Sequence, residues 1–552
     1  MSLAITASKD NWMVMDENGN PISNFAPNVL ACVDMYIDGE SKLKQYVRLT
    51  LLFDDGISGY EFMELLDNID NISWLRKDKR CRIHPRNSHI SAKRYLADLV
   101  RTEINSVKIP KEKAYRIHLL GTTILEDIPV FNAGGQLYWP PDISNKPTIE
   151  LEPILFNLDI DPGMTEEEVV ADIFELISLS PNAMRVILAQ SLLYIMRVAY
   201  EKAWKSPCCS VFLFGKTGVK KTTIASLITQ LYNRRQGIKN PPRLNASIPA
   251  AVKIIFEKND CVVVIDDLFP AESKAIKRKQ EETFIEITRI IADGIEPGRV
   301  RGNKVAKAPP SCGVLFTGEY VVGSGSDAAR LLPVELLPTP DGEKLKRFQD
   351  KPLLVSTFYH YYIKWFIANF HEILDLLKQW LEVYRKEPLG VHDRLQETHF
   401  FLNTAYALLL QYCFDKGFIS EQDAKSLHRS FLALLSELVM AQQLRVEQGK
   451  VIDAGHMVYL SHISSQYKSG FIHLADSAKQ FDDEWHDGII HDGCLCLRGG
   501  KIRKLFPGIL FEDIIDNLEN QNALKRVNDK KTKQIYGTGG KRFYAIPLEK
   551  LK

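Results

Sequence analysis

Two adjacent residues, Lys221 and Thr222, have the chemistry and the setting needed to bind a polyphosphate. They follow a loop that contains Gly215 and Gly218, and the loop follows four apolar residues at 211–214. Backbone N–H groups of such a loop would point at phosphate oxygens lying on the N-terminus of the next helix. Lys221 would then reach the β- and γ-phosphates, and the Thr222 hydroxyl would bind Mg²⁺. The stretch therefore predicts a site for nucleotide phosphates.

The loop departs at one position from the usual spacing of glycine, lysine and hydroxyl residues. Lys220 stands where a glycine is expected. If that position requires a positive φ, a side chain there costs roughly 1–3 kcal/mol of backbone strain. The alternative interpretation is a lysine-rich turn between a strand and a helix. The residues expected to contact the nucleotide are Gly215, Lys216, Thr217, Gly218, Val219, Lys220, Lys221, Thr222 and Thr223.

A second apolar run, residues 261–265, ends in two carboxylates, Asp266 and Asp267. The first carboxylate after a buried strand can hold Mg²⁺, and the second can polarise the water that attacks the γ-phosphate. We therefore expect Asp266 to bind the metal and Asp267 to act in catalysis. Glutamate is commoner at the second position. The side chain of Asp267 is shorter, which puts its contact with the attacking water in question.

Two more polar residues lie near the ends of apolar runs, Thr317 at the end of the run that starts at residue 313 and Arg330 just before the strand expected at 334–337. Thr317 is placed to orient the attacking water or to sense the γ-phosphate, and an ordinary strand end is the alternative. Arg330 lies too far around the expected sheet to serve its own nucleotide easily. Supplied to a neighbouring subunit, such an arginine stabilises the transferring phosphoryl group and is worth about 10³–10⁵ in rate. That role implies a ring of subunits.

Two basic segments are candidates for DNA contacts, because lysine and arginine neutralise the phosphate backbone. One resembles a hairpin that projects from the sheet, and the other follows an expected helix at 509–522 and resembles the wing of a winged helix. A surface hairpin and a solvated basic terminus are the respective alternatives. The cations are Arg299, Arg301, Lys304 and Lys307 in the first segment and Lys525, Arg526, Lys530, Lys531, Lys533, Lys541 and Arg542 in the second.

The elements that must position these residues fall into four regions of the 552-residue chain. Residues 1–150 read as a mixed α/β domain with helices at 59–68 and 91–105. Residues 151–345 read as a core domain that begins with helices at 165–179 and 182–204. From 211 to about 340 strands alternate with helices, which implies a parallel sheet with ligands at the carboxyl ends of its strands. Residues 346–442 read as a helical lid, and residues 443–552 as a winged-helix-like domain. The fold class is therefore multidomain α/β.

Composition limits the function classes. The chain is 45% hydrophobic and 25% charged with a net charge of +1, so nucleic-acid binding must rest on local patches. Nine scattered cysteines without a Cys-x-x-Cys pair indicate reduced thiols of a cytoplasmic protein and argue against zinc. No apolar run approaches eighteen residues, and Lys9 and Asp10 interrupt the N-terminus, so we expect no membrane span and no signal peptide.

The order of these motifs resembles the AAA+ ATPases of the pre-sensor-one hairpin clade. More narrowly, it looks like the minichromosome-maintenance-like replication helicases of staphylococcal cassettes, pathogenicity islands and other integrative mobile elements. The resemblance covers about residues 205–340 and implies a P-loop AAA+ core that uses ATP and Mg²⁺. It implies that Lys221 and Thr222 form the first nucleotide motif, Asp266 and Asp267 the second, Thr317 sensor one, Arg330 the arginine finger and Arg394 in the lid a second sensor.

The resemblance implies an ATP-dependent DNA helicase of a mobile genetic element. The enzyme would be a homo-oligomer, expected to be a hexamer, that translocates on single-stranded DNA during replication and also engages origin DNA. The hairpin cations would contact the translocating strand. One alternative is a superfamily-three-like initiator helicase. Another is a nucleotide-gated DNA-binding or scaffold ATPase, because Lys220 and Asp267 put the hydrolysis rate in question more than nucleotide binding.

Overall fold

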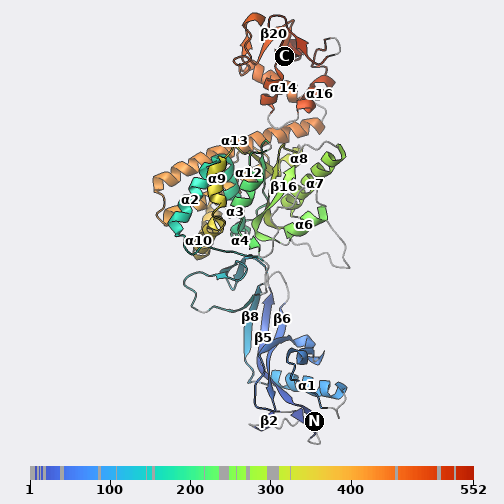
Figure 1. The fold of residues 1–552 in the computed structure, drawn as a ribbon, viewed down its shortest axis with the longest axis vertical. Coiled ribbons are helices and arrows are strands. Elements are labelled where there is room, and N and C mark those ends of the chain that lie inside the picture. Colours follow the sequence, from blue (N-terminus) through green and yellow to red (C-terminus); the bar gives the residue numbers. More distant parts are fainter. Residues whose placement is uncertain are drawn as a thin grey trace. The chain divides into compact units, whose positions relative to one another are not determined.

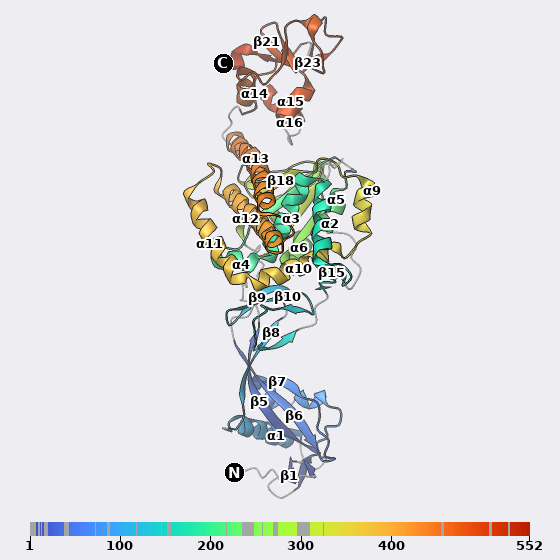
Figure 2. The ribbon, with the colours of Figure 1, turned by 90° about the vertical axis from the view of Figure 1, so that its left-hand side faces the viewer.

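The chain folds as two compact units, Met1–Asn157 and Leu158–Lys552. Figures 1 and 2 show them in a computed structural model, coloured along the sequence. The structure describes residues 7–8, 11–12, 14–15, 20–37, 43–71, 73–84, 89–106, 108–117, 119–144, 146–151, 156–216, 218–234, 248–256, 258–268, 274–294, 310–323, 325–453, 458–506, 511–527 and 530–551.

The N-terminal unit is built on a five-stranded sheet with the order β12-β8-β5-β6-β7. Buried and half-buried side chains alternate along β5, as expected for a strand with one face on a core. Helix α1 (His89–Ile104) covers that core, which includes Phe25, Trp74 and Leu96. The strands are β1 (Ala7–Ser8), β2 (Asn11–Trp12), β3 (Val14–Met15), β4 (Pro21–Ser23), β5 (Phe25–Ile37), β6 (Lys44–Phe53), β7 (Phe62–Leu65), β8 (Lys111–Ile117), β9 (Gly121–Leu125), β10 (Ile128–Asn132), β11 (Leu137–Tyr138), β12 (Thr148–Leu151) and β13 (Phe156–Asn157).

The helix expected at residues 59–68 is wrong. Strand β7 occupies Phe62–Leu65 and pairs antiparallel with β6, and the 3₁₀ helices η1 (Leu66–Asn71) and η2 (Ser73–Lys77) follow. The apolar spacing that suggested a helix is satisfied differently, because Phe62 and Leu66 pack against the core beneath the sheet. Tertiary pairing has overridden the local pattern.

The second unit contains a parallel four-stranded sheet with the order β16-β17-β14-β18. Helices cover both of its faces (Figure 1). Tyr194 of α3 lies against Gly313 of β17, where no side chain would fit, and the ring of Phe284 in α7 packs 4.6 Å from that of Phe316. Positions 313 and 316 point to opposite sides of a strand. The prediction of a multidomain α/β protein with a parallel sheet covered by helices is confirmed.

The strands and helices of this core follow one another along the chain in the alternation that the sequence predicted. They are α2 (Glu166–Ser178), α3 (Pro181–Ile195), α4 (Arg197–Ala203), β14 (Ser210–Phe214), α5 (Lys221–Ile228), β15 (Asn233–Arg234), α6 (Ile248–Phe256), β16 (Asn259–Leu268), α7 (Lys274–Asp293), β17 (Ser311–Gly318), α8 (Gly325–Ala328), β18 (Leu331–Glu335) and α9 (Gly342–Gln349). At the start of α2, Thr165 accepts from the backbone N–H of Glu168 at 3.3 Å while Glu168 accepts from the backbone N–H of Thr165 at 3.0 Å. This capping box fixes the residue at which α2 begins.

A group of long helices follows the sheet (Figure 2). They are α10 (Leu354–Ala368), α11 (Phe370–Lys386), α12 (Asp393–Asp415) and α13 (Glu421–Asp453). Helix α13 continues past residue 442, where the sequence placed the end of the lid. Within the described residues no single helix is long and apolar enough to cross a membrane, although the bent pair α3 and α4, with an angle of 70° between them, passes by length and composition when taken together.

The C-terminal part of the second unit forms a five-stranded sheet with the order β19-β20-β21-β23-β22. One face packs on helices through Leu495, Leu497 and Ile546, and the other packs around Phe543. Its elements are α14 (Val458–Lys468), β19 (Leu474–Ala475), η3 (Ala478–Gln480), β20 (Gly488–His491), β21 (Cys494–Leu497), α15 (Gly499–Leu505), α16 (Phe511–Asn520), β22 (Lys533–Gln534), β23 (Arg542–Pro547) and η4 (Leu548–Leu551). The two strands β22 and β23 and the turn between them are called the wing hairpin below.

Candidate functional site

The loop between β14 and α5, the candidate phosphate loop, contains two residues in the left-handed region of backbone conformation. Lys220 has φ +69° and ψ 26°, and Gly218 has φ +86°. The position expected to be glycine therefore does lie in the left-handed region, and its lysine carries roughly 1–3 kcal/mol of strain. Helix α5 starts at the next residue with no side chain capping its first turn. Its leading N–H groups are thus available to an anion. Thr217 lies outside the described residues.

The side chain of Lys221 folds back over this loop. Its ammonium donates to the carbonyl oxygens of Gly215 at 2.8 Å and Lys216 at 2.9 Å. A lysine in this position lies directly above the loop and needs only a change of rotamer to reach a phosphate bound there. These two hydrogen bonds hold the lysine side chain against the backbone carbonyls of the loop.

Three segments far apart in the sequence meet at the carboxylate of Asp266. The Thr222 hydroxyl, in the first turn of α5, donates to Oδ1 of Asp266 at 2.7 Å, and the Thr317 hydroxyl donates to the same oxygen. Thr317 is 1% exposed, so this contact lies in the interior of the protein. This set, Thr222, Asp266 and Thr317, is called the carboxylate cluster below.

Strand pairing explains the meeting point. Strands β16 and β17 run parallel with Ile265 opposite Phe316, and the register then shifts so that Leu268 faces Gly318. The extra residue in β16 is a bulge, and bulges re-aim the side chains at which they occur. It falls at positions 266 and 267, at the carboxyl edge of the sheet. Only the backbone of Asp267 is described, so its catalytic role stays a prediction.

The carboxylate cluster has donors suited to Mg²⁺. Hydroxyl and carboxylate oxygens are the ligands this ion prefers, and it normally keeps several waters or phosphate oxygens besides one or two protein ligands. Among the described residues no group of three or more His, Cys, Asp or Glu side chains would hold a metal without such help. Thr222 and Asp266 therefore fit a metal that arrives with a nucleotide.

A second charged group lies at the amino end of β18. Arg330 is 12% exposed and its guanidinium contacts Asp293 at 3.3 Å and the Ser326 carbonyl at 2.7 Å. Arg394, at the start of α12, contacts the same Asp293 at 2.7 Å. Its Nη1 atom is buried without a hydrogen-bond partner. The structure thus brings the predicted finger and the predicted second sensor together on one carboxylate; these three residues are called the arginine pair and its aspartate.

The phosphate loop and the arginine pair lie at opposite ends of the parallel strands, the loop at the carboxyl ends and Arg330 at the amino ends. Strands β14 and β18 are parallel neighbours with Ser210 opposite Leu331 and Phe214 opposite Glu335. Arg330 precedes β18, whereas the phosphate loop follows β14. Five residues at about 3.3 Å each separate the two ends by roughly 16 Å. Arg330 is therefore too far from the phosphate loop of its own chain to contact the same phosphoryl group.

Sequence reasoning missed the residues that hold the arginines. Asp293 ends α7, and Asp327 in α8 accepts two hydrogen bonds from Arg289, at 2.8 and 2.9 Å. Both aspartates stand within ordinary polar stretches, and neither has a spacing that would mark it. The expected hairpin, with Arg299, Arg301, Lys304 and Lys307, lies outside the described residues.

The predicted DNA-binding cations of the C-terminal domain are largely paired within the chain. Lys531 contacts Asp516 and Glu519, Arg526 contacts Glu519, Lys533 contacts Asp492, and Lys541 contacts Asp483. The pKa values of Glu519, Asp492 and Asp483 lie below their ordinary values because Lys531, Lys533 and Lys541, respectively, donate hydrogen bonds to them. Three cations are exposed and form no ion pair with any described residue: Lys525, Lys530 and Arg542.

The wing hairpin also differs from the predicted one. The sequence predicts strand-like arms at 524–527 and 542–546, but the strand paired with β23 is β22, where Lys533 faces Phe543 and Gln534 faces Arg542. Residue 525 makes only a backbone hydrogen bond to Ala545. The hairpin is consequently shorter, and its turn covers residues 535–541.

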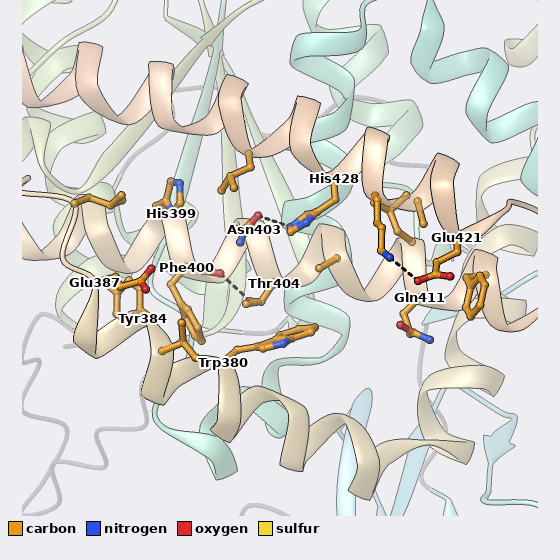
Figure 3. Close-up of a pocket in the computed structure, with 18 residues that line it drawn as sticks. Trp380, Tyr384, Glu387, His399, Phe400, Asn403, Thr404, Gln411, Glu421 and His428 are labelled. Carbon is orange, nitrogen blue, oxygen red and sulfur yellow. Dashed lines mark hydrogen bonds and ion pairs between the residues drawn. The ribbon is translucent and has the colours of Figure 1, made fainter.

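A cavity of about 810 Å³ lies between α11, α12 and α13 (Figure 3). Trp380, Tyr384 and Phe400 line one side of it, and His428 reaches Asn403 at 3.0 Å on the other. Burial lowers the pKa of the nearby His399 to about 4. No residue of the sheet or of the phosphate loop lines this cavity, so it is separate from the carboxylate cluster.

Comparison with solved structures shows a protein that shares the fold of this chain. No protein-family model and no curated protein matches the chain. The solved structure of SCCmec type IV Cch, described as an active helicase, aligns with a TM-score of 0.52 at 12% identity, covering 99% of this chain and 97% of that one. Identity this low shows a shared fold only.

Two further solved structures align more weakly. They are the apo C-terminal region of NrS-1 (TM-score 0.25, 11% identity, 72% of this chain and 86% of that one) and a JCV helicase with a bound small molecule (TM-score 0.20, 14% identity, 49% and 74%). Scores this low support no conclusion about this chain.

Proposed function

We propose that the chain is an ATP- and Mg²⁺-dependent DNA helicase whose second unit is an AAA+ motor. The observation that carries the proposal is the carboxylate cluster. Thr222, Asp266 and Thr317 come from three separate elements and converge beside a loop whose backbone suits a polyphosphate. The shared fold with a protein described as an active helicase supports the same conclusion.

Each residue has a distinct task in ATP hydrolysis. Lys221 would exchange the carbonyls of Gly215 and Lys216 for the β- and γ-phosphates. Thr222 and Asp266 would hold Mg²⁺, which supplies charge neutralisation to the phosphates when bound. The Thr317 hydroxyl would orient the attacking water. Asp267 would accept its proton.

The arginine pair would complete the site of a neighbouring subunit. Because Arg330 lies at the opposite end of the strands from its own phosphate loop, a ring of subunits can place it against the next nucleotide. Arg394 shares Asp293 with it and would enter the same site. In the single chain Asp293 holds both guanidinium groups, and the γ-phosphate of a neighbouring nucleotide would compete for them.

The DNA-binding parts complete the proposal. In a ring, which we take to be a hexamer, the hairpin around Arg299 and Lys304 would contact single-stranded DNA in the pore. The C-terminal domain would hold DNA near the ring through the exposed cations Lys525, Lys530 and Arg542. A role in the replication of a mobile genetic element, with origin DNA as a second partner, follows from the motif resemblance.

The test is ATP hydrolysis with and without single-stranded DNA, together with unwinding of a forked duplex. A motor should hydrolyse ATP in a Mg²⁺-dependent reaction that single-stranded DNA stimulates several-fold, and it should separate the fork only when ATP is present. A low rate that DNA does not change, with no unwinding, would contradict the helicase and favour a nucleotide-gated scaffold.

A further inference from the structure

The tip of the wing hairpin presents one aromatic ring to solvent. Tyr536 is 98% exposed, whereas its neighbour Ile535 is 2% exposed and Thr538 is 5% exposed. The turn is thus anchored on either side of the tyrosine. A fully exposed ring between two buried anchors gains nothing for the fold, because burial of apolar surface is what stabilises a side chain.

The turn is shaped so that this ring points outward. The Thr538 hydroxyl donates to the Ile535 carbonyl at 2.8 Å, and the Gln534 amide donates to the Gly540 carbonyl at 2.8 Å. Three glycines, at φ +94°, +64° and +75°, allow the chain to reverse within this short stretch. They are Gly537, Gly539 and Gly540. A tyrosine ring has only two χ angles, so it loses little conformational entropy when it binds a ligand.

The charge around the ring favours a nucleic acid. Arg542, opposite Gln534 at the base of the turn, is exposed and forms no ion pair with any described residue. Lys541 stays 44% exposed although it contacts Asp483. A ring flanked by cations can stack on a base while the cations contact the adjoining phosphates.

A second exposed ring in the same domain provides a contrast. Trp485 is 74% exposed but lies within an acidic loop, between Glu484 and Asp487. The two loops adjoin, since Phe481 packs 5.0 Å from Phe543 of the wing hairpin and Asp483 contacts Lys541. Acidic residues surround Trp485 in the sequence and repel a phosphate backbone, whereas basic residues follow Tyr536. Of the two rings, Tyr536 is therefore the better candidate for a DNA contact.

We propose that Tyr536 stacks on an unpaired base where single-stranded DNA leaves a duplex. The proposal deepens the proposed function and depends on it only in taking DNA as the ligand. Bases inside a duplex are already stacked on one another, so a protruding ring finds a free base face only at a junction or on a single strand. Tyr536 would thereby hold the strands apart at the fork.

The test measures binding of the full-length protein, without nucleotide, to a fluorescent fork, a single strand and a blunt duplex. Tyr536→Ala should weaken fork and single-strand binding about 5- to 150-fold, the range that loss of one base–aromatic stack produces. Duplex binding should change less than about twofold on the same basis. Tyr536→Phe keeps the ring and should bind as the wild type does. Trp485→Ala is the matched control and should also bind normally.

A fluorescent purine analogue placed at the junction gives a direct signal for stacking. Its emission should change on binding of the wild type and of Tyr536→Phe, but not of Tyr536→Ala. Equal affinity of Tyr536→Ala and wild type for the fork would overturn the proposal and would point to a protein as the ligand of this ring. A protein that binds DNA through Tyr536 but fails to hydrolyse ATP would refute the motor and leave this inference standing. Absence of DNA binding by the wild type would refute both.

Discussion

The carboxylate cluster and the C-terminal domain use polar side chains in opposite ways. At the cluster, two hydroxyls converge on one carboxylate, and no basic side chain is found with Asp266 among the hydrogen bonds and ion pairs of the described residues. In the C-terminal domain, most predicted DNA-binding cations already have carboxylate partners. The cluster is ready for an external cation, whereas the C-terminal domain has neutralised much of its own charge.

This difference shows what a sequence pattern can locate. Asp266 and Thr317 lie side by side because β16 and β17 are parallel neighbours. The alternation of apolar runs and helices predicted that these strands belong to a parallel sheet. The charge partners of Lys531 or Lys533 come instead from α16 and the turn before β21, which no local pattern connects to them. A run of basic residues is therefore a weaker guide to a site than residues at the ends of neighbouring parallel strands.

The largest effect should come from Lys221→Ala. Removing the ammonium group takes away the cation that faces the β- and γ-phosphates, so ATP turnover should fall at least about 100-fold. Steady-state hydrolysis measures this. Lys378→Ala, which removes an exposed lysine paired with Asp375 in α11, is the control and should retain normal turnover. Ordinary turnover in Lys221→Ala would remove the phosphate loop from the account.

A smaller loss should follow Thr317→Val, which preserves the shape of the side chain but removes its hydroxyl. Loss of a hydrogen bond to a charged group costs about 1.5–3 kcal/mol, so kcat should fall roughly 10- to 100-fold. Nucleotide affinity, measured with a fluorescent ATP analogue, should change little. Thr317→Ser retains the donor and should recover most of the rate. If the serine variant were as slow as the valine variant, the hydroxyl would have no special role.

Lys220→Gly should stabilise the loop modestly. Glycine adopts φ +69° without strain, so relief of roughly 1 kcal/mol should be offset only in part by the greater freedom of the unfolded chain. Thermal unfolding of the nucleotide-free protein would report the gain. Hydrolysis kinetics of the same variant separate the two roles of this lysine. A lower kcat would show that Lys220 acts as a second cation near the phosphates.

The smallest effect concerns the C-terminal domain. Glu519→Gln removes the carboxylate that contacts both Arg526 and Lys531. Arg526 loses this ion pair while Lys531 keeps Asp516, so affinity for duplex DNA should rise about two- to threefold at low salt. Salt titration of DNA binding should show a steeper slope. Asp375→Asn neutralises an ion-paired carboxylate in α11 and serves as the control. Unchanged affinity in Glu519→Gln would mean that this surface does not face DNA.

Much of the parallel-sheet core of the second unit was predicted from the sequence. The strands that carry Phe214, Asp266 and Thr317 were predicted, because apolar runs and strand ends are local features. The sequence named Lys220 as strained only if its position required a positive φ, and the structure shows that it does. The helix expected at residues 59–68 was wrong, since pairing of β7 with β6 outweighs a helical spacing of three apolar residues.

Features that depend on distant partners were out of reach. Nothing in the sequence marks Asp293 as the residue that holds Arg330 and Arg394, because α7, β18 and α12 meet only in the folded chain. The exposure of Tyr536 was equally hidden, since it depends on which neighbours the turn buries. Domain limits, the role of Asp267 and the expected hairpin that carries Arg299, Arg301, Lys304 and Lys307 stay predictions.

The central claim is that the phosphate loop of one subunit and the arginine pair of the next form one catalytic site. Mixing Lys221→Ala with Arg330→Ala subunits tests it most directly. Each variant should be inactive by itself. In an equal mixture shown to co-assemble at random, about one quarter of all subunit interfaces in the rings would join an intact loop to an intact arginine. Hydrolysis should therefore recover to about that fraction of the wild-type rate. No recovery in co-assembled rings would contradict the account.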